Sequence, residues 1–339
     1  MRSSTLAEIL SDIYIFMVLS GRSGRFRIEK EEAQMIKIAG KDTEVSRIFY
    51  GTAAEPFQSG GDGTELIEQM VNLGVNAIDT ARVYGRAEES VGRWIKIGNN
   101  RERITLLTKG GHPDMLWRSR IREKEIRKDL KTSLDKLCTD YIDIYLLHRD
   151  DPQVPVGEII ELLNALYNEG SIKSFGVSNW THERIAEGNE YAKEHGLIPF
   201  AVSSPCFSMA VPTREPWPGC LTISGDENED ARKWYIDSQM PVLAYSSMAA
   251  GFFSGRFKSD DYKGAKKVLS PDNYKTYVSE ENMATLKVCE DIAEETGLSV
   301  SQVAFSWIYG QDMNVYGVVS TKSAERMKQN VDAMLKAIS

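Results

Sequence analysis

The sequence predicts an α/β protein of the (β/α)₈ barrel class, folded as a single domain. From about residue 45, short apolar, β-branched segments alternate with longer segments of helical periodicity, and the alternation repeats eight times. Such alternation is typical of βαβ units and a parallel sheet. An open, doubly wound sheet would need a Gly-rich phosphate-binding turn after its first strand. The glycine cluster at residues 59–63 lacks that spacing and is more typical of a flexible βα loop.

Each predicted strand is followed by a predicted helix. The strands are Val45–Tyr50, Asn76–Asp79, Ile104–Thr108, Ile142–Leu147, Ser174–Val177, Phe200–Ser203, Val242–Tyr245 and Tyr316–Val319. The helices are Glu65–Leu73, Glu88–Ile97, Glu125–Leu137, Glu158–Asn168, Glu183–Glu194, Asp230–Gln239, Glu281–Thr296 and Ala324–Lys336, with one further amphipathic segment at Ser301–Tyr309. We expect the barrel domain to span residues 35–339 and residues 1–34 to be a poorly ordered extension.

Composition and charge narrow the possible partners and compartments. Of the 339 residues, 42% are hydrophobic and 27% charged, which is typical of a globular protein with a sizeable core. A net charge of −8 disfavours nucleic acid and anionic membranes as partners. The four cysteines form no CxxC pair and have no histidine at ligand spacing, so we expect neither a metal site nor disulfides, and a cytoplasmic location. The apolar run Ile13–Leu19 is too short to span a bilayer.

Four ionisable residues fall where the second, third and fourth predicted strands end. Asp79 ends the second strand and Tyr84 follows it in the next loop, while Lys109 and His148 end the third and fourth strands. In a (β/α)₈ barrel the chemistry lies at the carboxyl ends of the strands. We therefore expect all four side chains to meet at one mouth of the barrel.

These residue types suit the reduction of a carbonyl group. Hydride addition leaves an alkoxide that needs a proton, and a phenol such as Tyr84 is normally too weak an acid to supply it at neutral pH. Lys109 beside Tyr84 would lower the pKa of the phenol, and Asp79 would hold Lys109 charged. His148 could donate a hydrogen bond to the substrate oxygen. Each residue taken singly could instead be an ordinary rim residue, but the four together in this order favour a catalytic site.

The same segments resemble the aldo-keto reductase superfamily. Residues 75–85 read VNAIDTARVYG and residues 88–92 read EESVG, which is similar to the signature segment of that family. The resemblance continues through Lys109, the segment DYIDIYLLH at 140–148 and GVSN at 176–179, and covers residue 36 to the end. It implies Tyr84 as general acid, Asp79 and Lys109 as the residues that tune it, and His148 as the residue that orients the substrate.

The resemblance also implies a nicotinamide cofactor and the residues that hold it. Ser178 and Asn179 would bind the carboxamide, Tyr245 would stack on the nicotinamide ring, and the loop from Ser246 to Gly255 with Arg256 would hold the pyrophosphate. The full implied set of cofactor-binding residues is Gly51, Thr52, Ser178, Asn179, Ser204, Tyr245, Ser246, Met248, Gly251, Arg256, Ser320, Thr321, Arg326 and Asn330.

Two positions depart from the family pattern. Ser204 stands where a glutamine commonly binds the carboxamide, and Ser320 stands where a lysine is frequent near the 2′-phosphate. Arg326 and Asn330 keep the register of the 2′-phosphate clamp. Because arginine suits bidentate phosphate binding, NADP(H) is favoured over NAD(H).

The substrate pocket is predicted to be shaped by the long loop from Ser204 to about Asn228. Its prolines and Trp217 indicate either an ordered lid or a surface loop with no ligand role. Trp180 and His112 are also predicted to line the mouth. Tryptophan rings beside polar groups would suit a sugar or another polyol-like carbonyl.

The sequence is also compatible with two other functions. Some barrels of this kind are cofactor-sensing regulatory subunits with negligible turnover, and a hydrolase could use the paired carboxylates Asp150 and Asp151. Adjacent carboxylates rarely face one site, which disfavours the hydrolase. The favoured prediction is a reversible NAD(P)H-dependent oxidoreductase for an aldehyde or ketone, with a small molecule as its partner; the sequence predicts no oligomeric state.

Overall fold

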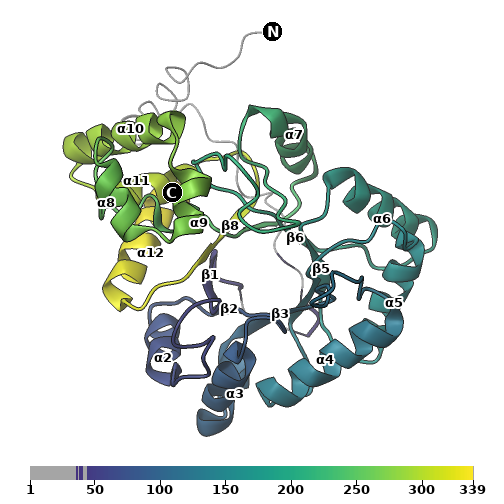
Figure 1. Ribbon diagram of the computed structural model, residues 1–339. Helices are drawn as coiled ribbons and strands as arrows, with labels where there is room; N and C mark the ends of the chain where they lie inside the picture. Colours follow the sequence, from purple (N-terminus) through teal and green to yellow (C-terminus); the bar gives the residue numbers. More distant parts are fainter. Residues whose placement is uncertain (1–35, 37, 41–43, 339) are drawn as a thin grey trace.

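Eight parallel strands close into a barrel in the computed structural model, with each strand hydrogen-bonded to its neighbours in chain order and β8 to β1 (Figure 1). The structure describes residue 36, residues 38–40 and residues 44–338. The strands are β1 Ile48–Gly51, β2 Ala77–Asp79, β3 Thr105–Gly110, β4 Ile144–Leu147, β5 Phe175–Ser178, β6 Val202–Ser204, β7 Val242–Ala244 and β8 Val315–Val319. The predicted (β/α)₈ barrel is thus confirmed. The extension predicted for residues 1–34 lies outside the described residues.

The helices surround the barrel (Figure 1). They are α2 Thr64–Asn72, α3 Ala87–Gly98, α4 Glu123–Leu137, α5 Val156–Asn168, α6 His182–Glu194, α7 Glu229–Ser238, α8 Tyr262–Val268, α9 Pro271–Tyr277, α10 Glu280–Thr296, α11 Val300–Tyr309 and α12 Ala324–Ile338, with 3₁₀ turns η2 Arg101–Arg103, η3 Asp226–Asn228 and η4 Ala249–Gly251. Each predicted helix is present, and the bounds differ by a few residues at most.

Helices α8 and α9 were not predicted. Each has seven residues, which is too short to display a clear apolar period. Their start signals are local: the side chain of Asp261 accepts a hydrogen bond from Gly264 N at 2.7 Å, and that of Ser270 accepts one from Asn273 N at 3.2 Å. With α10 and α11 they enclose a separate apolar cluster beside the barrel.

The core has two layers because neighbouring strand residues point to opposite faces of the sheet. Phe49, for example, belongs to the cluster that fills the barrel with Leu243 and Tyr316. Ile48 and Tyr50 belong instead to the larger cluster between strands and helices. A filled interior holds the strand ends rigidly, so side chains at those ends have fixed positions.

Candidate active site

Asp79, Tyr84 and Lys109 meet at the carboxyl ends of β2 and β3. Asp79 is paired with Leu107 in the parallel ladder, so Lys109 lies two residues further along the same face of β3. The Lys109 ammonium forms an ion pair with the Asp79 carboxylate, and both side chains are almost fully buried. Lys109 Nζ also donates to Thr80 O at 3.1 Å and lies 3.4 Å from the Tyr84 hydroxyl. The structure therefore brings the three residues together as predicted.

The electrostatics of this cluster differ in one respect from the sequence-based expectation. Burial is the largest influence on Tyr84 and raises the pKa of its phenol, although the nearby Lys109 charge pulls that pKa down. Burial alone would lower the pKa of Lys109, but the charges and hydrogen bonds of Asp79 and Tyr84 outweigh it and raise that pKa. At neutral pH the cluster thus presents a protonated phenol beside a charged lysine.

His148 completes the cluster from the end of β4. Its backbone N–H donates to Gly110 O at 2.8 Å, which fixes it next to the end of β3. Its ring stands edge-on to Tyr84 with 5.8 Å between ring centroids, and Nδ1 is buried without a hydrogen-bond partner among the described residues. Burial, and then the positive charges of Lys109 and Arg149, hold the pKa of His148 well below its usual range. The ring is therefore neutral at physiological pH and has one N–H to donate.

The two aromatic residues predicted at the mouth differ in their placement. His112 lies beside His148, with 5.1 Å between ring centroids, so its predicted position is confirmed. Trp180 is 1% exposed and packs against Phe200 in the core between strands and helices. It forms no part of an open mouth, because the end of β5 turns its indole toward α6, where the guanidinium of Arg184 lies over the ring.

The residues predicted to hold a carboxamide form a connected set at the ends of β5, β6 and β7. Asn179, in a left-handed backbone conformation with φ 60°, donates from Nδ2 to Ser178 Oγ at 2.9 Å. Ser178 Oγ donates to Ser204 O at 2.8 Å, and Ser204 Oγ donates to Leu243 O at 2.9 Å. Both serine hydroxyls thus bind neighbouring strands and keep only their acceptor capacity for a ligand. The Tyr245 hydroxyl donates to Asn179 Oδ1 at 2.5 Å.

The long loop after β6 covers this set. Trp217 stacks on Tyr245 with 5.6 Å between ring centroids and 29° between planes. Leu221 N donates to Asn179 Oδ1 at 3.0 Å, and Cys220 Sγ lies 3.0 Å from the Tyr245 hydroxyl. The loop therefore contacts the two side chains predicted to receive the nicotinamide, which supports the lid alternative over a loop with no role at the site.

The segment after β7 is a series of tight turns that ends beside Arg256. Ser246, Ala249, Ala250 and Gly251 all have positive φ, between 47° and 92°. The N–H groups of Ala249 and Gly251 donate within the segment, to Ser246 O at 2.7 Å and to Met248 O at 3.0 Å, so the backbone forms consecutive tight turns. The side chain of Arg256 lies against Gly251, where an added Cβ would come within 3.1 Å of Nη2. Arg256 is exposed, so its guanidinium is the group of this segment that could bind a pyrophosphate, and Met248 beside it is half-buried.

The remaining predicted cofactor residues lie where β1 and β8 end side by side. Ser320 Oγ donates to Gly51 O at 2.7 Å, and a Cβ on Gly51 would lie 2.8 Å from that hydroxyl, so the close approach requires glycine. Thr52 Oγ1 donates to Asp79 O at 3.0 Å, which directs it into the barrel rim. Thr321 O accepts from Tyr50 Oη at 2.8 Å.

Helix α12 begins just beyond this edge and carries the predicted phosphate clamp. Arg326 is exposed on its first turn and Asn330, one turn later, is buried. Among the described residues no carboxylate pairs with the Arg326 guanidinium, so its charge is available to an anion. The donor sets at the two ends of the barrel mouth thus fit a phosphorylated dinucleotide.

Arg149 lies beside the cluster and was not predicted from the sequence. It follows His148 directly and is 6% exposed, and its Nη1 donates to His148 O at 2.8 Å. In the sequence it stands at the head of the charged run Arg149, Asp150, Asp151, which is typical of a solvated loop. The one feature of the sequence that could have identified it is its position directly after His148, at the end of the fourth strand.

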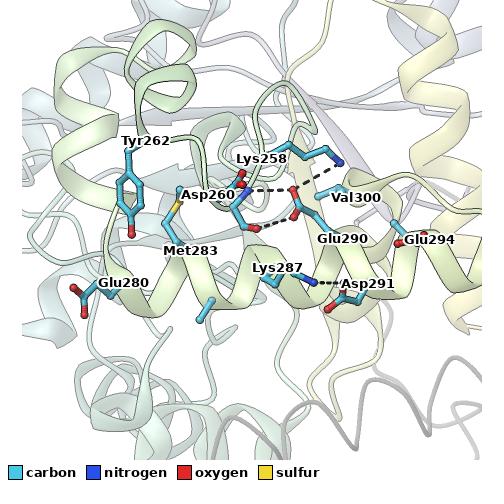
Figure 2. A pocket seen from close by; sticks show the side chains of 13 residues that line it. Lys258, Asp260, Tyr262, Glu280, Met283, Lys287, Glu290, Asp291, Glu294 and Val300 are labelled. Carbon is cyan, nitrogen blue, oxygen red and sulfur yellow. Dashed lines mark hydrogen bonds and ion pairs between the residues drawn. The ribbon is translucent and has the colours of Figure 1, made fainter.

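A groove of about 880 Å³ on the outside of the helical layer does not resemble a catalytic site. It lies along α10, which Figure 1 places at the periphery of the molecule. Figure 2 shows some of its side chains bound to one another: Lys258 lies 3.9 Å from Glu290, Ser259 Oγ donates to Glu290 at 2.7 Å, and Lys287 pairs with Asp291. Its two lysines are thus paired, and because five carboxylates line the same groove it is acidic overall.

Comparison with known proteins agrees with the barrel fold and shows the family. The family model described as the aldo/keto reductase family matches residues 47–339. Aldo-keto reductase YhdN of Bacillus subtilis (strain 168) is 28% identical over 312 residues, covering 86% of this chain and 87% of that protein. Aryl-alcohol dehydrogenase GME11368 of Pestalotiopsis microspora is 26% identical over 283 residues, covering 80% of this chain and 67% of that protein. The structure of an aldo/keto reductase from Klebsiella pneumoniae in complex with NADP and acetate superposes with a TM-score of 0.62 at 23% identity, covering 88% of this chain and 89% of that one.

The chain belongs to the aldo/keto reductase family of oxidoreductases. The family resemblance stated from the sequence is thereby confirmed. Among the described residues, no helix is long and apolar enough to cross a membrane.

Proposed function

We propose that this protein catalyses reversible hydride transfer between NADP(H) and an aldehyde or ketone, with Tyr84 as the general acid and base. The observation that carries the proposal is the buried cluster in which Lys109 bonds both Asp79 and Tyr84 while His148 faces the same phenol. Bound NADPH supplies the hydride that adds to the carbonyl carbon.

The side chains of the cluster manage the proton and the charge on the substrate oxygen. The neutral ring of His148 donates a hydrogen bond to the carbonyl oxygen and orients it toward Tyr84. The Tyr84 hydroxyl then gives its proton to that oxygen as negative charge develops there. The Lys109 ammonium stabilises the tyrosinate that remains, and Asp79 keeps Lys109 charged and in place. In alcohol oxidation the tyrosinate takes the proton back.

Cofactor binding is proposed for the residues that the sequence analysis named. Asn179, Ser178 and Tyr245 would hold the nicotinamide end, and the segment Ser246–Arg256, with the exposed Arg256, would hold the pyrophosphate. The exposed Arg326 would bind the 2′-phosphate, which favours NADP(H) over NAD(H). Support comes from the connected polar set at β5–β7 and from the unpaired guanidinium on α12.

The test of the enzymatic proposal is steady-state oxidation of NADPH against a panel of aldehydes and ketones. Tyr84→Phe is expected to lower kcat for carbonyl reduction about 100- to 10,000-fold, because the proton donor is lost. NADPH affinity of Tyr84→Phe, measured by cofactor fluorescence, should stay within about threefold, since the hydroxyl has no proposed cofactor contact. Equal turnover by Tyr84→Phe would overturn the role of Tyr84. NADPH binding without turnover of any carbonyl would instead favour a cofactor-sensing subunit.

The cofactor preference has its own test. Arg326→Ala should weaken NADPH binding about 10- to 100-fold and leave NADH binding within about threefold, because only NADPH carries the 2′-phosphate. Lys328→Ala, on the same helix but paired with Asp332 at 3.1 Å, is the matched control. Equal losses for the two cofactors would reverse the preference.

A further inference from the structure

Arg149 is a buried cation beside the proposed catalytic residues. It follows His148 in the chain, is 6% exposed, and has an Nε that is buried without a hydrogen-bond partner among the described residues. Among the same residues its guanidinium donates one hydrogen bond, from Nη1 to His148 O at 2.8 Å, and forms no ion pair. A guanidinium has five N–H donors, so most of its capacity is unused.

Such a charge is costly to bury unless something compensates it. A carboxylate that acts electrostatically on Arg149 is that of Glu215, which lies on the loop after β6 and contributes less than Tyr245, Cys220 or Tyr84. The Glu215 carboxylate is itself engaged, because Oε2 accepts a hydrogen bond from Gly219 N at 3.1 Å. No described protein group therefore neutralises Arg149 by direct contact.

The surroundings of Arg149 place it at the barrel mouth, beside the proposed catalytic residues. The loop after β6 passes over it at Gly219, where an added Cβ would lie 3.3 Å from Nε. Its charge also lowers the pKa of Tyr84, His112 and His148, which lie around the barrel mouth. A substrate whose carbonyl oxygen contacts Tyr84 and His148 would therefore lie close to the positive charge of Arg149. An anionic group on that substrate would lie between Arg149 and the loop after β6.

We propose that Arg149 binds an anionic group on the substrate, so that the protein prefers aldehydes or ketones that carry a carboxylate or a phosphate monoester. The inference rests on the proposed carbonyl reduction and adds its substrate class. A planar guanidinium matches the two oxygens of such groups in bidentate geometry, and the low dielectric of the pocket strengthens that contact. It also refines the polyol prediction, since acidic and phosphorylated sugars combine both features.

The test compares charged aldehydes with neutral partners of similar size, in wild type and in Arg149→Met. The pairs are succinic semialdehyde with butanal, and glyceraldehyde 3-phosphate with glyceraldehyde; they distinguish carboxylate from phosphate as the preferred group. In at least one pair, the wild-type kcat/KM for the anionic aldehyde is expected to exceed that for the neutral one by about tenfold or more. Arg149→Met is expected to reduce this ratio of kcat/KM values about 10- to 100-fold, chiefly by raising KM for the anionic aldehyde. Arg149→Lys should retain part of the preference that Arg149→Met loses, because lysine keeps the positive charge but lacks the planar guanidinium that binds two oxygens at once.

A matched control and a binding measurement separate this inference from the proposed function. Arg127→Gln, which removes a guanidinium paired with Glu169 on the outer surface, should leave the ratio unchanged. A ratio near one in wild type, or an equal ratio in Arg149→Met, overturns the inference while reduction of neutral aldehydes still supports the proposed function. If no carbonyl is reduced, calorimetric titration of the NADPH-loaded protein with benzoate and with inorganic phosphate decides the role of Arg149. At least tenfold weaker binding of either anion to Arg149→Met supports the role, and equal binding of both refutes it.

Discussion

At the scale of single residues, Lys109 links Asp79 to Tyr84, the proposed general acid. It bonds the Asp79 carboxylate on one side and lies 3.4 Å from the Tyr84 hydroxyl on the other. Burial pushes the pKa of Tyr84 upward, and the Lys109 charge is the main influence that opposes it. The phenol is therefore protonated at neutral pH, as reduction requires, yet it can release its proton because a cation stands beside the resulting tyrosinate.

Lys109→Met should shift the pH dependence of alcohol oxidation to higher pH. Oxidation needs the tyrosinate, and losing the ammonium raises the pKa of Tyr84 further, so less tyrosinate is present at any given pH. The measurement is kcat/KM for NADP⁺-dependent oxidation from about pH 6 to pH 10. The ascending limb should move to higher pH, and the rate of carbonyl reduction at neutral pH should fall about 100-fold or more.

The double variant Asp79→Asn/Lys109→Met serves as the control. The Asp79 charge raises the pKa of Tyr84, so removing both charges should displace the limb less than removing Lys109 alone. An ascending limb that stays in place in Lys109→Met would contradict the proposed tuning of Tyr84.

The residues of the cluster could be predicted because they lie at strand ends within a specific motif. Arg149 could not be identified in the same way. Its significance depends on its burial and on the lack of a carboxylate partner among the described residues. Neither property can be inferred from a stretch of consecutive charged residues in a sequence. The raised pKa of Tyr84 was likewise unpredictable, since it depends on how far the surrounding residues exclude water from the phenol.

At the scale of elements, the loop between β6 and α7 shapes the site most directly. Its contacts with Tyr245, Asn179 and Arg149 join residues that are far apart in the sequence. Apolar periodicity predicted the regular elements around it, because each strand and long helix buries one recurrent face. An irregular loop has no such period, so its path over the barrel mouth could be learned only from the structure.

Trp217→Ala is expected to strengthen NADPH binding about 2- to 10-fold. If Tyr245 receives the nicotinamide ring, the ring must replace the indole that stacks there at 5.6 Å, and losing an aromatic pair worth about 0.5–1.5 kcal/mol lowers that cost. Titration followed by cofactor fluorescence measures the dissociation constant. Trp117→Ala, which removes an indole that contacts His112 instead, should leave it unchanged. Weaker NADPH binding by Trp217→Ala would mean that the indole supports the cofactor.

At the scale of the whole molecule, the two ends of the barrel have different tasks. The carboxyl ends of the strands hold the proposed chemistry, and the amino ends are held by buried polar contacts. Arg101, before β3, pairs with Asp143, before β4, at 2.8 Å, and the same carboxylate accepts a hydrogen bond from Leu106 N at 2.7 Å. In such barrels the amino-terminal face contributes stability and not catalysis.

Arg101→Met should therefore destabilise the fold without changing the chemistry. It removes the buried Arg101 guanidinium from the Asp143 carboxylate, and breaking a buried ion pair in this way costs about 3–5 kcal/mol in the free energy of unfolding. Arg103→Met is the matched control, because Arg103 pairs with Glu68 at 2.7 Å on the surface, where an ion pair contributes at most about 1 kcal/mol. Urea denaturation measures both, and kcat/KM per folded molecule should equal the wild-type value in each. If Arg101→Met lowered kcat/KM while stability held, the amino end of the barrel would have to be coupled to the site, and the division of tasks between the two ends would be wrong.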